Sequence, residues 1–98
     1  MKHPCVYILA SYKNGTLYIG VTSDLPSRLE DHLNGIGSKF TRQHNVKRLV
    51  WFEDHPNMES AIQREKSLKR YPRQWKINLI EAHNPAWQPL HPDTGEFL

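Results

Sequence analysis

The chain contains little cysteine and no long apolar segment. Its single cysteine, Cys5, cannot form an internal disulfide, which favours a reducing compartment. The longest apolar run is CVYILA at residues 5–10, far short of the roughly 18 residues that cross a bilayer. Because this strand-like run starts almost at once, no signal peptide is evident. We therefore expect a cytoplasmic protein that does not contact a membrane.

Several common functional motifs are also missing. No two of the six histidines have the spacing of zinc ligands. The sequence has neither a glycine-rich phosphate loop nor a nucleophile elbow. Cys5 lies inside an apolar run, where a core position is expected more than a nucleophile. These absences are unfavourable for a zinc enzyme, a P-loop nucleotide-binding protein or a serine hydrolase.

The residues that are present predict one small folded domain. Of the 98 residues, 38% are hydrophobic, and ten are aromatic. This content is too high for a disordered chain, and the length is too short for two cores. The net charge is only +3, but basic residues are concentrated between Arg64 and Lys76 around one acid, Glu65. Such a stripe attracts nucleic-acid phosphates, although a solvated helix face has the same composition. The candidate nucleic-acid-binding residues are Arg64, Lys66, Lys69, Arg70 and Arg73.

The first 22 residues predict a β-hairpin. Residues 5–10 are rich in β-branched and aromatic side chains, and Asn14-Gly15 is a strong turn signal. In the second strand, at residues 16–22, Tyr18 and Gly20 share one face.

Helices and a third strand follow the hairpin. Ser23 or Asp24 is expected to cap a helix that ends near residue 34, and residues 38–45 predict a helical turn. A strand is expected at 46–53, and Asn57 caps a helix at 58–70. Pro72 separates that helix from another at 73–83. The order β-β-α-β-α-α predicts an α+β fold, a three-stranded antiparallel β-sheet flanked by α-helices. We expect residues 1–83 to form the domain and 84–98 a proline-containing tail with Trp87 as its packing residue.

The helical spacing in two predicted helices identifies three candidate catalytic or metal-binding side chains. The helical period of residues 58–70 predicts an apolar stripe formed by Met58, Ala61, Ile62 and Leu68. Glu65 falls within this stripe, where a carboxylate needs a cationic partner. That partner is either a structural Arg or Lys or a metal ion at a cleft. Arg28 and His32 lie one turn apart at the margin of the first helix's apolar stripe. Each is also common as a surface or packing residue.

The ordered set of these residues resembles the GIY-YIG nucleases. Val6-Tyr7 and Tyr18-Ile19-Gly20 resemble the family's two strand motifs, and Arg28 and Glu65 follow in the family's order. The sequence is similar to small stand-alone bacterial members, which resemble the N-terminal incision domain of the excision-repair nuclease.

The resemblance implies a metal-dependent endonuclease that nicks DNA in repair or recombination, with RNA not excluded as a substrate. It implies that Tyr18 or Tyr7 activates the attacking water and that Arg28 holds the scissile phosphate. Glu65 would ligate a single Mg²⁺ or Mn²⁺ ion, and His32 would form hydrogen bonds or transfer a proton. These roles suit phosphodiester hydrolysis, which needs charge neutralisation and an oriented nucleophile.

Three departures from the family pattern leave other functions open. Cys5 replaces the first glycine, and Val21 stands where the repair subunit has an active-site lysine, which Lys13 or Lys39 could replace. Asn78 is one residue away from the spacing of the family's late asparagine, and Asn84 is further from it. The alternatives are a non-catalytic nucleic-acid-binding module on the same fold and a protein-interaction domain that uses Trp87 and the tail.

Overall fold

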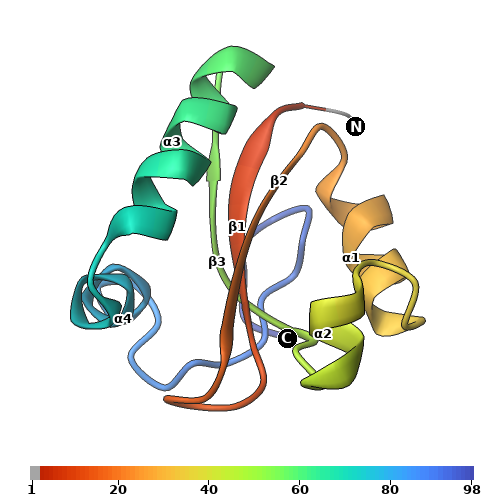
Figure 1. Ribbon diagram of the computed structural model, residues 1–98, viewed down its shortest axis with the longest axis vertical. Coiled ribbons are helices and arrows are strands. Elements are labelled where there is room, and N and C mark those ends of the chain that lie inside the picture. The colour runs from red at the N-terminus through yellow and green to blue at the C-terminus, as the bar shows by residue number, and fades with distance from the viewer. Residues whose placement is uncertain (1–2) are drawn as a thin grey trace.

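A three-stranded antiparallel sheet forms the centre of the computed structural model, which describes residues 3–98 (Figure 1). The strands are β1 (Cys5–Ala10), β2 (Leu17–Thr22) and β3 (Arg48–Asp54), in the order β2-β1-β3. The predicted turn is present in the β1–β2 connection, where Asn14 adopts a φ of 60° and the N–H of Gly15 donates to the carbonyl of Tyr12 at 2.9 Å. The predicted α+β fold is confirmed.

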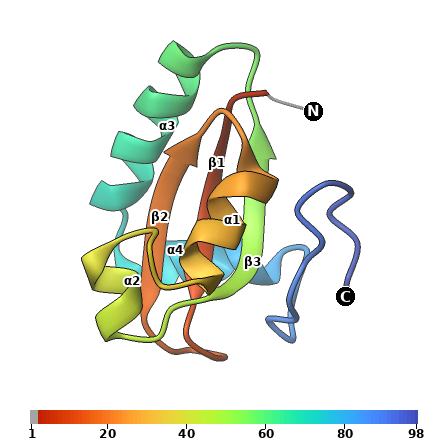
Figure 2. The same ribbon diagram turned by 90° about the vertical axis from the view of Figure 1, so that its right-hand side faces the viewer.

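Helices cover both faces of the sheet. On one face lie α1 (Leu25–Leu33) and the short α2 (Lys39–Gln43). On the other lie α3 (Met58–Arg70) and α4 (Arg73–Glu81), so the sheet is the middle of three layers (Figures 1 and 2). Of the described helices, none is long and apolar enough to cross a membrane.

Side-chain caps fix the starts of the first three helices. Asp24, Ser38 and Asn57 each accept a hydrogen bond from the main-chain N–H three residues later. Pro72 precedes α4, where its missing N–H costs no helical hydrogen bond. Each prediction of a helix start is therefore confirmed within a few residues.

Every residue of the central strand β1 is buried, because each face of the sheet carries its own core. Val6, Ile8 and Ala10 belong to the core on the α3 and α4 side. Cys5, Tyr7 and Leu9 belong to the core on the α1 side. Tyr7 therefore points toward α1, on the same face as Tyr18.

The segment after α4 packs along β3. Trp87 is fully buried and donates a hydrogen bond from Nε1 to Glu81 at 2.7 Å. The main-chain N–H of Leu90 donates to the carbonyl of Leu49 at 2.9 Å. Figure 2 shows this segment beside β3, on the side away from β2. The C-terminal segment thus contributes a large side chain to the core and contacts an edge strand.

Candidate active site

Tyr7 lies over a position of β2 that only glycine can fill. Tyr7 pairs with Gly20 across the β1–β2 register, and its ring covers the glycine main chain. A Cβ atom on Gly20 would lie 2.8 Å from Cε1 of Tyr7 and closer still to its hydroxyl group. The glycine of the Tyr18-Ile19-Gly20 motif therefore provides the space that the tyrosine of the first strand occupies.

A directed chain of hydrogen bonds leads from Tyr7 into α2. The Tyr7 hydroxyl lies 3.0 Å from Nε2 of His32, and Nδ1 of His32 lies 3.1 Å from Oγ1 of Thr41. The Thr41 hydroxyl donates to the carbonyl of Ser38 at 3.1 Å. With that proton donated to Ser38, His32 donates from Nδ1 to Thr41 and accepts from Tyr7 at Nε2. In this tautomer, neutral His32 is the proton acceptor for Tyr7.

The protonation states agree with this direction. Burial raises the pKa of Tyr7 to about 12, and the neighbouring Arg28 opposes that rise. Burial lowers the pKa of His32, and the charge of Arg28 lowers it further, while Asp31 opposes this. Near neutral pH, Tyr7 is accordingly an uncharged phenol and His32 an uncharged imidazole.

Gly37 holds both His32 and Arg28. A Cβ atom on Gly37 would lie 2.7 Å from Cγ and Cε1 of His32, so the imidazole packs directly on this main chain. Nη2 of Arg28 donates to the carbonyl of Gly37 at 2.6 Å. The loop between α1 and α2 therefore fixes Arg28 and His32 of α1 relative to each other.

Arg28 is the cation next to both tyrosines. Burial lowers the pKa of Arg28, but the Tyr7 and Tyr18 hydroxyl groups raise it by more, so the guanidinium remains charged. Its side chain is about one-third exposed, at 33%, and a second nitrogen lies 3.8 Å from Asp31. A partly exposed guanidinium beside two phenols can donate hydrogen bonds to a phosphate.

Tyr18 faces an open cleft at the edge of β2. The cleft has a volume of about 300 Å³ and is lined by Leu17, Tyr18, Ile19, Phe40, Lys69 and Lys76. Tyr18 is partly exposed, whereas Tyr7 is only 1% exposed. The lining comes from both sides of the edge strand, with Phe40 from α2 and the two lysines from α3 and α4. Of the two tyrosines, Tyr18 is the one that a substrate can reach.

Glu65 lies one helical turn before Lys69 on α3. Its side chain is 15% exposed, and Oε2 lies 3.2 Å from Nζ of Lys69, which lines the cleft. Ala61 and Leu68 of the predicted stripe are fully buried, but Ile62 is 37% exposed. The cationic partner required by the sequence is present as Lys69, and the carboxylate retains contact with solvent.

Comparisons with known proteins agree with this geometry. The model of the GIY-YIG catalytic domain matches residues 3–78. The chain belongs to the GIY-YIG family. A UPF0213 protein from Clostridium perfringens is 40% identical over 77 residues, which cover 79% of this chain and 82% of that protein. A UPF0213 protein from Xanthomonas axonopodis is 36% identical over 70 residues, 71% of this chain and 69% of that protein. The solution NMR structure of a UPF0213 protein from Bacillus halodurans is similar with a TM-score of 0.52 and 36% identity, covering 86% of this chain and 87% of that one.

Family membership makes this a domain of the nuclease superfamily, whose members generally use divalent metal ions. Within residues 3–98, no three His, Cys, Asp or Glu side chains are grouped as a metal cluster. The carboxylate that contacts a residue of the cleft is Glu65, which is 15% exposed and pairs with Lys69. One carboxylate fits Mg²⁺, which retains several waters and takes further oxygen ligands from substrate phosphates. Glu65 would hold the ion in this GIY-YIG domain.

The candidate nucleic-acid-binding residues divide into two groups. Arg64 donates to Glu53 at 3.1 Å and to the Tyr71 hydroxyl at 3.3 Å. Arg73 donates to the carbonyl groups of Asn14 and Gly15 in the hairpin turn. These two guanidinium groups make internal structural contacts. Lys66, Lys69, Arg70 and Arg73 are exposed, and Lys76 joins Lys69 in the cleft.

Neither late asparagine is placed with the tyrosines. Asn78 is exposed on α4 and accepts a hydrogen bond from Gln74 at 2.8 Å. It lies two residues after Lys76, about 200° around the helix, so it points away from the cleft. Asn84 is 2% exposed and donates to the carbonyl groups of Val50 and Gln88. Asn84 fixes the C-terminal segment, and the mechanism proposed below uses neither residue.

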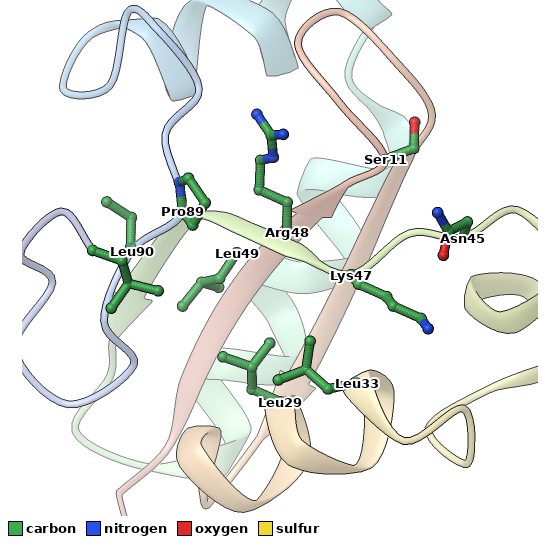
Figure 3. Close-up of a pocket in the computed structure, with 10 residues that line it drawn as sticks. Ser11, Leu29, Leu33, Asn45, Lys47, Arg48, Leu49, Pro89 and Leu90 are labelled. Atoms are coloured by element: carbon green, nitrogen blue, oxygen red, sulfur yellow. The ribbon is translucent and has the colours of Figure 1, made fainter.

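A second pocket, apolar and about 330 Å³ in volume, lies apart from these groups. It is bounded by Leu29 and Leu33 of α1, the start of β3 and the C-terminal segment (Figure 3). The residues that line this pocket do not include Tyr7, Tyr18, Arg28 or Glu65.

The residues that support the site were missed at the level of sequence. Phe40 and Thr41 belong to the 38–45 region, where the sequence predicts only a helical turn, and Gly37 lies in the connection just before it. The Ser38-x-x-Thr41 capping spacing was the available signal.

Proposed function

We propose that this chain is a divalent-metal-dependent endonuclease that hydrolyses phosphodiester bonds in DNA at the edge of β2. The proposal rests on one observation. Tyr18 lies against Arg28 on one face of the sheet and lines a cleft that also contains Lys69, the partner of Glu65 on the other face. A phosphate in this cleft would meet the Tyr18 phenol and the ammonium groups of Lys69 and Lys76. The Arg28 guanidinium lies beside Tyr18, and the Glu65 carboxylate lies beside Lys69.

In this proposal Tyr18 contacts the attacking water. Its hydroxyl oxygen accepts a hydrogen bond from the water and orients it toward phosphorus. The water passes a proton to the Tyr18 oxygen as Tyr18 releases its own phenolic proton to solvent, so the phenol acts as a relay. The new bond joins the water oxygen to phosphorus, and the bond from phosphorus to the leaving sugar oxygen breaks. That sugar oxygen takes up a proton from solvent. A bound Mg²⁺ or Mn²⁺ would supply charge neutralisation at the phosphate.

Arg28 and Lys69 would stabilise the charge that develops on the phosphate. Arg28 is held in place by Gly37 and retains free N–H groups, so it can donate to the non-bridging oxygens without reorganising. Val21 stands where the repair subunit has an active-site lysine. In this chain Lys69 and Lys76 place two ammonium groups at the cleft, and they would supply the missing positive charge. Lys13 and Lys39, the replacements considered from the sequence, are exposed and do not line this cleft.

Tyr7 and His32 would act as positioning residues. Both are 1% exposed, so neither is available to a substrate while this packing persists. Burial keeps both groups uncharged beside the Arg28 cation, and their hydrogen bond fixes the surface on which Arg28 lies. This differs from the first expectation, which gave Tyr7 and Tyr18 interchangeable roles.

The test is nicking of supercoiled plasmid, single-stranded DNA, branched DNA and RNA in Mg²⁺ or Mn²⁺. Wild type is compared with Glu65→Gln and with Glu59→Gln, an exposed carboxylate of the same helix. We expect wild type and Glu59→Gln to cut DNA at the same rate and Glu65→Gln to lose at least about 100-fold. Equal rates for all three proteins would contradict the proposal. DNA binding by wild type without any cutting would instead favour the non-catalytic module.

A further inference from the structure

Phe40 is an exposed aromatic ring in a wall of the cleft. Its exposed fraction is 42%, although a phenylalanine is ordinarily buried. Its ring is stacked on Tyr18, with centroids 6.2 Å apart and planes inclined by 29°. The His44 ring lies on Phe40 at 4.6 Å. Phe40 therefore extends the aromatic surface of the site outward from Tyr18.

Contacts of its two helix neighbours Ser38 and Thr41 fix the position of Phe40. Phe40 belongs to α2, whose first turn is capped by Ser38. The next residue, Thr41, is 1% exposed and bonds to His32. These contacts hold a five-residue helix against the sheet and keep the Phe40 ring at the cleft.

The rest of the cleft has the chemistry of a nucleotide site. Leu17 and Ile19 supply apolar surface, and Lys69 and Lys76 supply two positive charges. No acidic residue is among those that line the cleft in the described part of the chain. Aromatic rings beside a cationic groove bind single-stranded nucleic acid, because bases stack on the rings and phosphates pair with the cations.

We propose that this cleft binds one unpaired base stacked on Phe40, with the neighbouring phosphates held by Lys69 and Lys76. The substrate class is therefore DNA that is single-stranded at the nucleotide beside the scissile phosphate. In a duplex both faces of a base are covered by its neighbours, so Phe40 can stack only on a base that has left the helix. The proposal deepens the function proposed above and rests on it.

The experiment measures binding of labelled oligonucleotides by fluorescence anisotropy in EDTA, so that no strand is cut. A single strand of about 12 nucleotides and the corresponding blunt duplex are titrated with wild type, Phe40→Leu, Phe40→Trp and the control Phe97→Leu. Leucine keeps apolar volume but lacks a ring face. Phe97 is 54% exposed and lies in the C-terminal segment, outside the residues that line this cleft.

We expect Phe40→Leu to weaken single-strand binding by at least about fivefold and duplex binding by less than about twofold. Phe40→Trp and Phe97→Leu are expected to bind like wild type. The added tryptophan fluorescence of Phe40→Trp, measured relative to wild type, should be quenched by the single strand. Single-strand binding by Phe40→Leu within twofold of wild type would overturn the inference, as would an equal loss for strand and duplex.

Binding and cutting separate the two proposals. If wild type cuts DNA but Phe40→Leu binds single strands normally, the nuclease proposal stands and the stacking site is wrong. If Phe40 controls single-strand binding but no DNA is cut, the stacking site stands and hydrolysis is wrong. If wild type binds no nucleic acid at low salt, both proposals are wrong.

Discussion

The side chain of Tyr7 on β1 occupies the space that a Cβ atom of Gly20 on the paired strand β2 would fill. The ring of Tyr7 lies against the Gly20 main chain, where a Cβ atom would lie 2.8 Å from Cε1 of the ring. The glycine of one sequence motif is thus required by the tyrosine of the other. This contact explains in steric terms why the two motifs occur together in this GIY-YIG chain.

Gly20→Ala is expected to destabilise the protein by about 1–3 kcal/mol, because the methyl group forces the buried Tyr7 ring to move. Urea unfolding of wild type and variant measures this change. In a Tyr7→Leu background the same substitution should cost at least about 1 kcal/mol less, since the opposing ring is gone. Equal costs in the two backgrounds would show that the ring and the glycine are not coupled.

His32 should make stability depend on pH. The pKa of His32 is lowered in the folded protein by burial and by Arg28, with Asp31 opposing, relative to its ordinary value of 6.5. The unfolded chain therefore takes up a proton that folded His32 resists, and the free energy of unfolding falls as the pH drops below about 6.5. Above about pH 7 this contribution is fully present.

Urea unfolding at pH 7.5 and pH 5.5 checks this sign. The loss of stability between the two values should be smaller in His32→Gln, which lacks the titrating imidazole, than in wild type. All other residues are the same in the two proteins, so their contributions cancel. An identical loss in the two proteins would contradict the prediction.

Lys69 and Lys13 test which lysine supplies the additional cation. Lys69→Ala should lower the single-turnover cleavage rate by about 10- to 100-fold, because it removes an ammonium group from the cleft. It should also reduce the slope of log binding constant against log salt by about 1. Lys13→Ala should leave both quantities near wild type, since Lys13 is exposed in the hairpin connection. The reverse pattern would assign the cation to Lys13.

The two tryptophans Trp87 and Trp75 test whether residues 84–98 belong to the folded unit. Trp87→Ala should cost about 3–5 kcal/mol, because a fully buried indole leaves a large cavity. Trp75 is 57% exposed, and Trp75→Ala should cost less than about 1 kcal/mol. Denaturant unfolding of both variants and of a chain ending at residue 83 gives the comparison. A chain that ends at residue 83 and is as stable as wild type would confirm the proposed domain boundary and exclude a structural role for the tail.

Local signals made most of the fold predictable. The Asn14-Gly15 turn depends on its own two residues, and the caps at Asp24 and Asn57 depend on residues three positions away. The helical period also identified Glu65 as a carboxylate beside apolar residues. These features follow from short-range geometry, which a single sequence contains.

The remaining features depend on contacts between distant segments. The packing of Gly37 on His32 and of Phe40 on Tyr18 exists only after α2 has docked on the sheet. Arg64 was expected to bind nucleic acid, but the side chain of Glu53 on β3 is within reach and binds it. Ile62 was expected in the core, yet it is 37% exposed while Ala61 and Leu68 are fully buried. No local sequence pattern predicts these contacts or this exposure, because they depend on residues far apart in the chain.

The most direct test of the central claim is a double-mutant cycle between Tyr18 and Glu65, measured as single-turnover cleavage of DNA in Mg²⁺. Each of Tyr18→Phe and Glu65→Gln should slow cutting by at least about 100-fold. If both side chains act on one phosphate around the edge of β2, the double variant should be about as slow as the slower single variant. Wild-type rates for either single variant, or a double variant slowed by the full product of the two effects, would contradict a shared site.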